Sequence, residues 1–280
     1  MAVQYEDKYV TVFQSALHQT TSTVAVTKDV ILIVDPTWLP EEIAAIQEYV
    51  ESVDEGQRKY LLFTHSDFDH IIGYNAFPEA VTIASRGFVA RTGKKETMQE
   101  LQDFDDHYYI QRPYVLDYPR IDIIIDYDEQ IMEIGDTKLT FYLAPGHTPD
   151  GTFLIINNLK VLICGDYLSD VEFPFITHTC SAYERTLKKL ETVIFDKEIE
   201  LVIPGHGTAT TELKEMRDRI EDSRWYLEAL KKEAVSNEDY DVLQAFVDSF
   251  LFSRFLSEKH NENREVLKKE LEREQAEHQR

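Results

Sequence analysis

The chain has 280 residues, a formal net charge of −23 and 43% hydrophobic residues, so it is long enough for one large or two small domains with a substantial core. A surface this acidic repels nucleic-acid phosphates and anionic membranes, and we expect neither as a partner. Two cysteines, no secretory signal in residues 1–10 and no apolar run of membrane-spanning length together predict a cytoplasmic location.

Short β-branched runs open the chain and predict a meander of strands over residues 10–13, 22–26 and 30–34. Asp35 follows the last of these runs, and we expect it to cap a turn. Pro40 stands ahead of acidic residues and of apolar residues at helical spacing, which predicts a helix to about Ser52. A further strand near Tyr60 completes an order of strand, helix and strand that indicates layered α/β packing.

The middle of the chain returns to strands after a less regular region over residues 85–128. This region contains a predicted helix from Thr97 to Tyr109, and its aromatic residues either form local core or line a substrate pocket as a lid. Apolar runs predict one strand before this region, over residues 81–84. They predict further strands over residues 121–125, 130–134, 138–143, 152–156, 161–164 and 201–204, with a helix over 181–195 before the last strand.

Beyond Thr211 the sequence is helical and heavily charged. We predict an amphipathic helix from Leu213 to Leu230 and a more apolar helix from Val242 to Phe255, followed by a polar, frayed tail over residues 261–280. The apolar face of the second helix either covers the core of its own chain or forms a homodimer contact. We therefore expect one α+β domain over residues 1–210 and a helical extension over 211–280.

Potential metal ligands crowd the loop after the strand predicted near Tyr60. Carboxylates and imidazoles this close together repel each other or must be neutralised, and a bound cation resolves that cost. A helix is expected to begin directly after the loop, at Ile71. The ligand-type residues of the loop are His65, Asp67, Asp69 and His70.

Three later stretches have the same design, in which a short apolar run ends at a glycine-bounded His or Asp. They deliver His147, Asp166 and His206. The order and spacing of all these residues resemble the metallo-β-lactamase superfamily of metal-dependent hydrolases, whose signature is His-x-His-x-Asp-His followed by a lone His, a lone Asp and a last His. The resemblance implies an α+β fold, an αββα sandwich of two mixed β-sheets flanked by helices, with the catalytic part in residues 1–210.

Carried over position by position, the resemblance implies two divalent metal ions per chain, with zinc favoured and manganese or iron as alternatives. A hydroxide that bridges the ions would be the nucleophile, because a cation lowers the pKa of bound water from 15.7 towards about 7. Asp69 would also orient this hydroxide. The first ion would be held by His65, Asp67 and His147, the second by Asp69, His70 and His206, and both by Asp166.

One position departs from the signature, because Asp67 stands where the family usually has its second His. A carboxylate is harder and more negative than an imidazole, which shifts the preference from zinc towards manganese or iron. The flavodiiron relatives carry Glu at this place and reduce oxygen or nitric oxide, so a di-iron oxidoreductase is the alternative function. No flavodoxin-like segment follows in this sequence, which favours hydrolysis.

Weaker candidates lie around Asp166. The phenols of Tyr167 and Tyr183 either assist catalysis, by a hydrogen bond to a substrate oxygen or protonation of a leaving group, or simply pack. The loop after Asp166 also holds Asp170 and Glu172, which would favour a cationic substrate, and His178, which either faces the pocket or lies on the surface. Cys164 is expected to be a small buried residue.

These observations predict a dinuclear metallo-hydrolase that cleaves a small ester, lactone, thioester or phosphodiester. The other two possibilities are the di-iron oxidoreductase and a non-catalytic binding or scaffold protein that kept the fold. The complete ligand set argues against a scaffold, since drift would be expected to erase at least one ligand. The substrate is expected to be a small molecule, whose identity depends on residues 85–128 and on the loop after Asp166.

Overall fold

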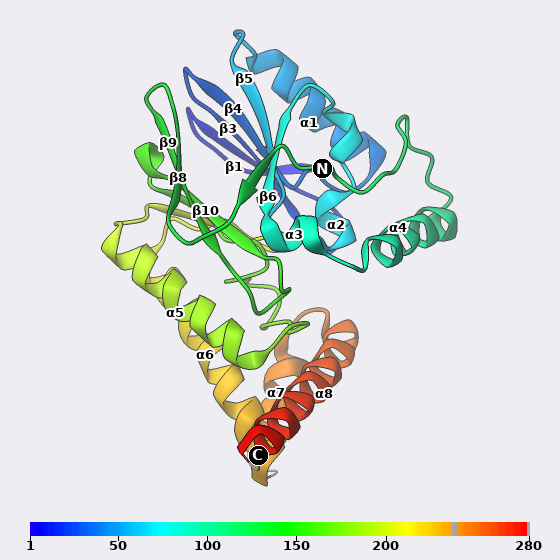
Figure 1. The fold of residues 1–280 in the computed structure, drawn as a ribbon, viewed down its shortest axis with the longest axis vertical. Coiled ribbons are helices and arrows are strands. Elements are labelled where there is room, and N and C mark those ends of the chain that lie inside the picture. The colour runs from blue at the N-terminus through cyan, green and yellow to red at the C-terminus, as the bar shows by residue number, and fades with distance from the viewer. Residues whose placement is uncertain (237–239, 279–280) are drawn as a thin grey trace.

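In the computed structural model, which describes residues 1–236 and 240–278, two mixed β-sheets pack face to face between layers of helices (Figure 1). The first sheet has its strands in chain order, antiparallel from β1 to β4 and parallel from β4 to β7. Its strands are β1 (Ala2–Glu6), β2 (Val10–Gln14), β3 (Thr21–Val26), β4 (Val30–Val34), β5 (Arg58–Leu62), β6 (Val81–Ser85) and β7 (Ile123–Ile125).

The second sheet has the order β12-β11-β10-β9-β8. Only β11 and β12 pair in parallel among these described strands, and the other neighbours are antiparallel. The strands of this sheet are β8 (Gln130–Ile134), β9 (Thr137–Leu143), β10 (Thr152–Ile156), β11 (Val161–Ile163) and β12 (Leu201–Ile203).

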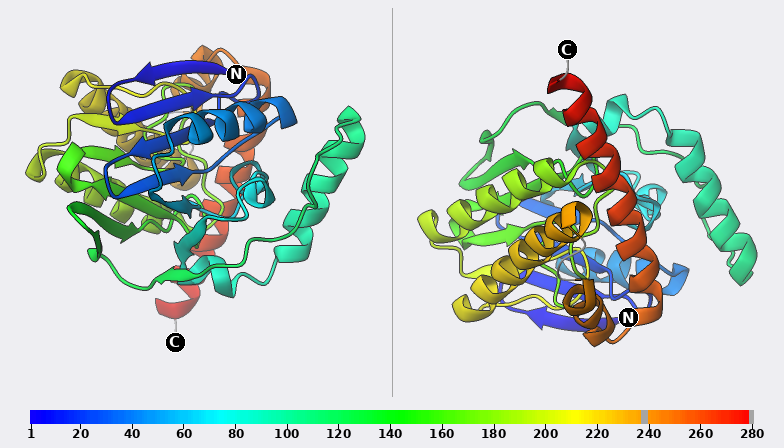
Figure 2. Two further views of the ribbon diagram at one scale, coloured as in Figure 1. Left: turned by 90° about the horizontal axis from the view of Figure 1, so that it is seen from above. Right: turned by 90° about the horizontal axis from the view of Figure 1, so that it is seen from below.

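Helices cover the outer face of each sheet, and α4 projects to one side of the sandwich (Figure 2). The 3-10 turns η1 (Tyr74–Ala76) and η2 (Asn157–Leu159) lie between strands. The helices on the side of the first sheet are α1 (Pro40–Val53), α2 (Phe68–Ile71), α3 (Arg86–Ala90) and α4 (Lys94–Tyr108). Those on the side of the second sheet are α5 (Cys180–Asp196), α6 (Leu213–Ser236), α7 (Tyr240–Ser249) and α8 (Ser253–His278).

The core follows these layers. One cluster of buried side chains lies between the sheets, a second lies between the first sheet and α1, and a third lies between the second sheet and the C-terminal helices. Every residue of β4 is buried, as expected for a strand with both faces covered, and its sequence is accordingly a continuous apolar run. The predicted αββα sandwich is confirmed.

Several local predictions were wrong. β1 was not predicted, because its sequence AVQYE alternates weakly and the strand lies at the sheet edge. The helix expected to begin at Ile71 is instead α2, which starts at Phe68 with Asp67 at its N-cap, so Asp69 and His70 stand on a helix.

The C-terminal region also departs from its prediction. The apolar helix expected to run to Phe255 ends at Ser249, and a new helix starts at Ser253. The tail expected to fray forms most of α8, where Asn263 and Leu267 are buried, because these two residues face the rest of the chain on an otherwise polar helix. In the described part of the chain, no helix combines the length and apolar character needed to cross a membrane.

The apolar face of α7 lies against its own chain. Leu243 and Val247 belong to the cluster that also contains Leu187 of α5 and Tyr226 of α6. Of the two alternatives for this face, the structure therefore supports core packing. Exposed apolar residues nearby include Val242 and Leu251, and a homodimer contact stays a prediction.

Candidate metal centre

Strand ends from both sheets gather at one edge of the sandwich. Within each sheet the strands concerned run in the same direction, since β4 pairs in parallel with β5, β11 pairs in parallel with β12, and β9 and β11 are both antiparallel to β10. Their carboxyl ends therefore open on the same cleft. The residues that follow these ends are Asp35 after β4, His65 after β5, His147 after β9, Asp166 after β11 and His206 after β12.

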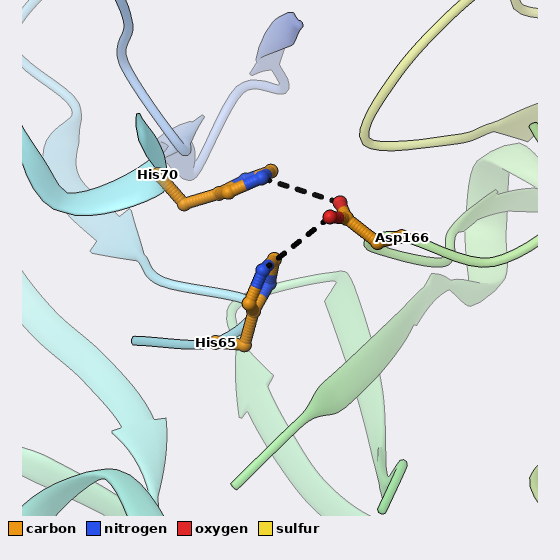
Figure 3. Close-up of side chains that lie close together, drawn as sticks. All are labelled: His65, His70 and Asp166. Carbon is orange, nitrogen blue, oxygen red and sulfur yellow. Dashed lines mark ion pairs between the residues drawn. The ribbon is translucent and has the colours of Figure 1, made fainter. Parts of the chain in front are cut away.

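Asp166 stands at the centre of the cluster, and His65 and His70 point toward its carboxylate (Figure 3). Its Oδ1 lies 3.2 Å from Nε2 of His70. Its Oδ2 lies 3.1 Å from Nε2 of His147, 3.3 Å from Nε2 of His206 and 3.6 Å from Nε2 of His65. One carboxylate thus faces four imidazoles that the sequence delivers from three separate strand ends, since His65 and His70 both follow β5.

The two remaining carboxylates divide the cluster into two groups. Asp67 Oδ2 lies 3.4 Å from Nε2 of His147 and 3.7 Å from Nε2 of His65. Asp69 Oδ2 lies 3.4 Å from Nε2 of His206 and 3.5 Å from Nε2 of His70. Within each group the ligand atoms lie within 4.8 Å of one another, and the same holds for the ligand atoms of His65, His70 and Asp166.

The outer nitrogen of every imidazole in the cluster has a fixed partner. Nδ1 of His147 lies 3.0 Å from the carbonyl of Phe175, and Nδ1 of His206 lies 3.0 Å from the carbonyl of His18. A carbonyl can only accept, so each Nδ1 must donate. Nδ1 of His70 lies 3.0 Å from the Asp35 carboxylate, which also only accepts.

Nδ1 of His65 also donates a hydrogen bond, but its acceptor is a hydroxyl group. Its Nδ1 lies 3.0 Å from the Thr64 hydroxyl, and that hydroxyl donates its proton to Asp35. The hydroxyl therefore accepts from His65. With Nδ1 protonated in all four imidazoles, each neutral ring turns the lone pair of Nε2 toward the cleft, which is the state that a metal requires.

The inward-facing atoms are buried and lack hydrogen bonds. Among the described residues, Nε2 of His65, His70 and His147 and Oδ1 of Asp166 have no hydrogen-bond partner. Buried polar atoms without partners are costly, and a cation in each group would satisfy them. The donor set of imidazole nitrogens and carboxylate oxygens therefore fits divalent metal ions.

The electrostatics of the metal-free cluster are dominated by the three carboxylates. Burial lowers the pKa of His147, but the charges of Asp166 and Asp67 prevail and raise it to about 10. Burial raises the pKa of Asp166, yet the surrounding imidazoles of His206 and His70 hold it well below its usual range. For His65, burial is the larger effect and its pKa is lowered. Protons therefore neutralise this cluster when metal does not.

A cavity of about 490 Å³ opens above the cluster. Its apolar lining includes Trp38, Phe68, Phe175, Ile176 and Phe255. Its charged lining beyond the cluster comes from Arg91, Glu100, Glu172, Lys259 and Glu262. Phe104 belongs to the region 85–128, whose aromatic residues were predicted to form local core or to line a pocket. Its ring centroid lies 4.7 Å from that of Trp38, and Phe104 packs in the local core. Glu100, one helical turn earlier on α4, lines the cavity.

The two candidate tyrosines lie beneath the cluster rather than in the cavity. Tyr167 is buried, its hydroxyl donates to the carbonyl of Ala144 at 3.1 Å, and it accepts from the N–H of His147 at 3.0 Å. The Tyr183 hydroxyl donates to the Asp166 carbonyl at 3.4 Å. Burial raises the pKa of both phenols. These contacts favour packing and support of the ligand loops over proton transfer.

The other candidate residues near Asp166 have different surroundings, and only one of them lines the cavity. Glu172 lines the cavity, and burial raises the pKa of its carboxyl group. Asp170 instead accepts from the N–H of Thr208 and so holds the turn after His206. His178 is exposed and lies outside the cavity lining, and Cys164 is buried as predicted.

Two contributors were missed or misassigned at the sequence level. Asp35 does not merely cap a turn, because its buried carboxylate fixes His70 and accepts from the N–H of Thr64 at 2.9 Å. Its place after a strand paired to β5 was a usable signal. The guanidinium of Arg91 lies 3.8 Å from the carboxylate of Asp67 and 3.9 Å from that of Asp150. No motif in the sequence around Arg91 indicated this position.

Fold and site together define a class of proteins: an αββα sandwich with a histidine- and aspartate-rich cluster between the strand ends, as in metal-dependent hydrolases. A family model described as the metallo-beta-lactamase superfamily matches residues 16–219. The chain therefore belongs to the metallo-beta-lactamase superfamily. A comparison with curated proteins found no match.

Solved structures share the fold at low sequence identity. A metallo-beta-lactamase from Pontibacter korlensis is 15% identical with a TM-score of 0.56, and the match covers 80% of this chain and 98% of that one. A superfamily protein from Sulfolobus tokodaii is 17% identical with a TM-score of 0.55, covering 82% and 90%. A double mutant of the sec-alkyl sulfatase PisA1 is 13% identical with a TM-score of 0.63, covering 84% and 43%.

Proposed function

We propose that the protein is a dinuclear metallo-hydrolase. The observation that carries this proposal is the common orientation of four imidazoles, each with Nδ1 donating outward and Nε2 facing the carboxylates of the cleft. A structural cluster has no need of this arrangement, since buried imidazoles are cheaper to keep when both nitrogens are hydrogen-bonded. Imidazole nitrogens that face one cleft, with their outer nitrogens fixed by acceptors, are what a metal centre needs.

We assign the predicted ligands to two ions according to the distances between their ligand atoms. His65, Asp67 and His147 would hold one ion, Asp69, His70 and His206 the other, and Asp166 would contact both. When bound, such a pair supplies a nucleophile from water near neutral pH and polarises the substrate oxygen. The protein's own part is to fix the ring orientations from outside and to keep the site within a walled cavity.

The substrate that we propose is a small ester, lactone, thioester or phosphodiester. A cavity of about 490 Å³ suits a small molecule. Its walls are asymmetric, because Arg91 adjoins Asp67 while the ring of His18 stacks on Trp38 beside the His206 group. A substrate with a polar end and an apolar end would fit this division.

A di-iron oxidoreductase is the second candidate, and Asp67 favours it. With Asp67, three carboxylates face the four imidazoles, and oxygen-rich sets suit iron and manganese better than zinc. The iron content and a visible absorption band distinguish this candidate from the hydrolase.

The test is elemental analysis of protein purified without added metal, followed by assays with ester, lactone, thioester and phosphodiester substrates. We expect about two equivalents of a divalent metal and hydrolysis of at least one class. An Asp166→Ala variant should lose metal and hydrolysis together. Full hydrolysis by that variant would exclude the assignment of Asp166, and iron with a visible band but no hydrolysis would favour the oxidoreductase.

A further inference from the structure

The segment that holds His147 is itself held by the C-terminal helix α8. The carbonyl of Phe175 accepts from Nδ1 of His147 at 3.0 Å, and the N–H of Thr177 donates to the His147 carbonyl at 2.8 Å. Residues 174–177 thus fix both the ring and the backbone of one predicted ligand. This segment has no regular secondary structure of its own, so something else must fix it.

Asn263 of α8 binds this segment on both sides of Phe175. Its Oδ1 accepts from the N–H of Ile176 at 2.8 Å, and its Nδ2 donates to the carbonyl of Pro174 at 2.6 Å. The second Nδ2 hydrogen bond goes to the Tyr226 hydroxyl at 2.8 Å. The Asn263 side chain is only 1% exposed, so water cannot replace these partners.

The pattern of donors and acceptors requires an amide. A carboxylate could still accept from Ile176 but would oppose the Pro174 carbonyl, and an alanine would leave both peptide groups unpaired. The same helix also reaches the far end of the segment, because Glu270 accepts from the N–H of Cys180 at 2.7 Å and caps α5. The face of α8 that carries Asn263 also contributes Phe255 and Lys259 to the cavity wall.

We propose that Asn263 is a positioning residue for the metal centre, which acts by holding the Phe175 carbonyl against Nδ1 of His147. Asn263 lies beyond residues 16–219, the part that the superfamily model matches, so this support comes from outside the matched region. The inference rests on the proposed function for its consequence, since His147 is a ligand only if the cluster binds metal.

The test compares Asn263→Asp with Asn261→Asp, a matched control on the exposed side of the same helix. Zn²⁺ affinities of the two ion sites are measured by competition with a chelator in the full chain, together with thermal unfolding of the metal-free forms. We expect Asn263→Asp to weaken one of the two sites by about 10–100-fold and to leave the other within experimental error, because loss of an outer partner has this effect on one ligand. Asn261→Asp should match the wild type.

A double-mutant cycle with His147→Ala gives the sharper reading. If Asn263 acts through His147, Asn263→Asp should lower Zn²⁺ affinity no further in the His147→Ala background. Equal weakening of both sites, or an additive effect in the cycle, would overturn the proposal by showing a general loss of stability.

Failure of the proposed function would be visible separately. If the wild type binds no divalent metal, nitrogen NMR of the metal-free protein still reports whether Nδ1 of His147 carries a slowly exchanging proton. Faster exchange of that proton in Asn263→Asp than in Asn261→Asp would support the positioning role without any metal. Equal exchange in both variants would refute it.

Discussion

Asp35 offers the most direct test of how the centre is held, because replacing it changes no predicted ligand. Its carboxylate lies 3.0 Å from Nδ1 of His70 and accepts from the N–H of Thr64 at 2.9 Å. Its backbone has a φ of 46°, which asparagine tolerates better than most residues. Asp35→Asn therefore keeps the shape and the backbone but removes the charge behind His70.

The expected loss follows from these contacts. The Asn amide can still accept from Thr64 through one oxygen, but its second group no longer holds the proton of His70 as a carboxylate does. Removing such an outer partner lowers metal affinity by about 10–100-fold, or about 1.4–2.7 kcal/mol. Asp35→Ala should in addition leave the buried N–H of Thr64 unpaired, at a cost of about 1–3 kcal/mol in the free energy of unfolding.

The assay is chelator competition for Zn²⁺ combined with denaturant unfolding of the metal-free protein. Asp122→Asn is the matched control, since Asp122 accepts from the N–H and the hydroxyl of Thr82 much as Asp35 does from Thr64, but outside the cluster. Wild-type Zn²⁺ affinity in Asp35→Asn would refute the idea that this carboxylate sets the orientation of His70.

Two further predictions concern the preferred metal and the protons that the site releases when a metal binds. Asp67→His should give a folded protein that retains zinc more strongly, because a nitrogen donor replaces an oxygen; an unchanged metal preference, measured by competition between Zn²⁺ and Mn²⁺, would contradict this account of Asp67. In the metal-free protein the pKa of His147 is raised to about 10, above the unfolded value of about 6.5, so its ion pair with Asp166 contributes fully below pH 6.5 and is lost as pH rises through about 10. Zn²⁺ binding at pH 8 should therefore release protons, which calorimetry in buffers of different ionisation enthalpy measures, and His147→Ala should release fewer.

Much of the sandwich could be predicted from sequence because its strands carry their own signals. β4 is a continuous apolar run, β5 ends in the apolar residues Tyr60 to Leu62, and α5 has apolar residues at helical spacing, so the local sequence indicates each element. β1 failed this test. Its five residues mix polar and apolar side chains and are exposed or half-buried, as suits a strand at the edge of a sheet. Its pairing with β2 joins two separate segments, so the local sequence does not indicate it.

The residues of the site also differ in whether the local sequence indicates their role. The ligand-type residues could be found because each follows an apolar run, whereas the residues that orient them act across long sequence distances. Asp35 and His70 are 35 positions apart, and Asn263 and Ile176 are 87 apart. The polarity of Asn263 even argued for an exposed tail, since a polar residue on a charged helix gives no sign that a peptide segment will cover it.

The last prediction concerns the boundary expected at residue 210. Tyr226, Leu227 and Leu230 of α6 are fully buried in the same cluster as Leu187 and Leu190 of α5, so a chain cut after residue 210 would expose this face. Burial of one large apolar side chain stabilises by about 1.5–3 kcal/mol, and several such losses approach the whole stability of a domain, about 5–15 kcal/mol.

We therefore expect the 1–210 fragment to be insoluble or to lack cooperative thermal unfolding. A chain cut after Leu271 is the control, because residues 272–277 are exposed and their removal should change the melting temperature little. Cooperative unfolding of the 1–210 fragment near the wild-type temperature would show that the helices are a separable extension. Its absence would mean that the C-terminal helices complete the core on which the ligand loops rest.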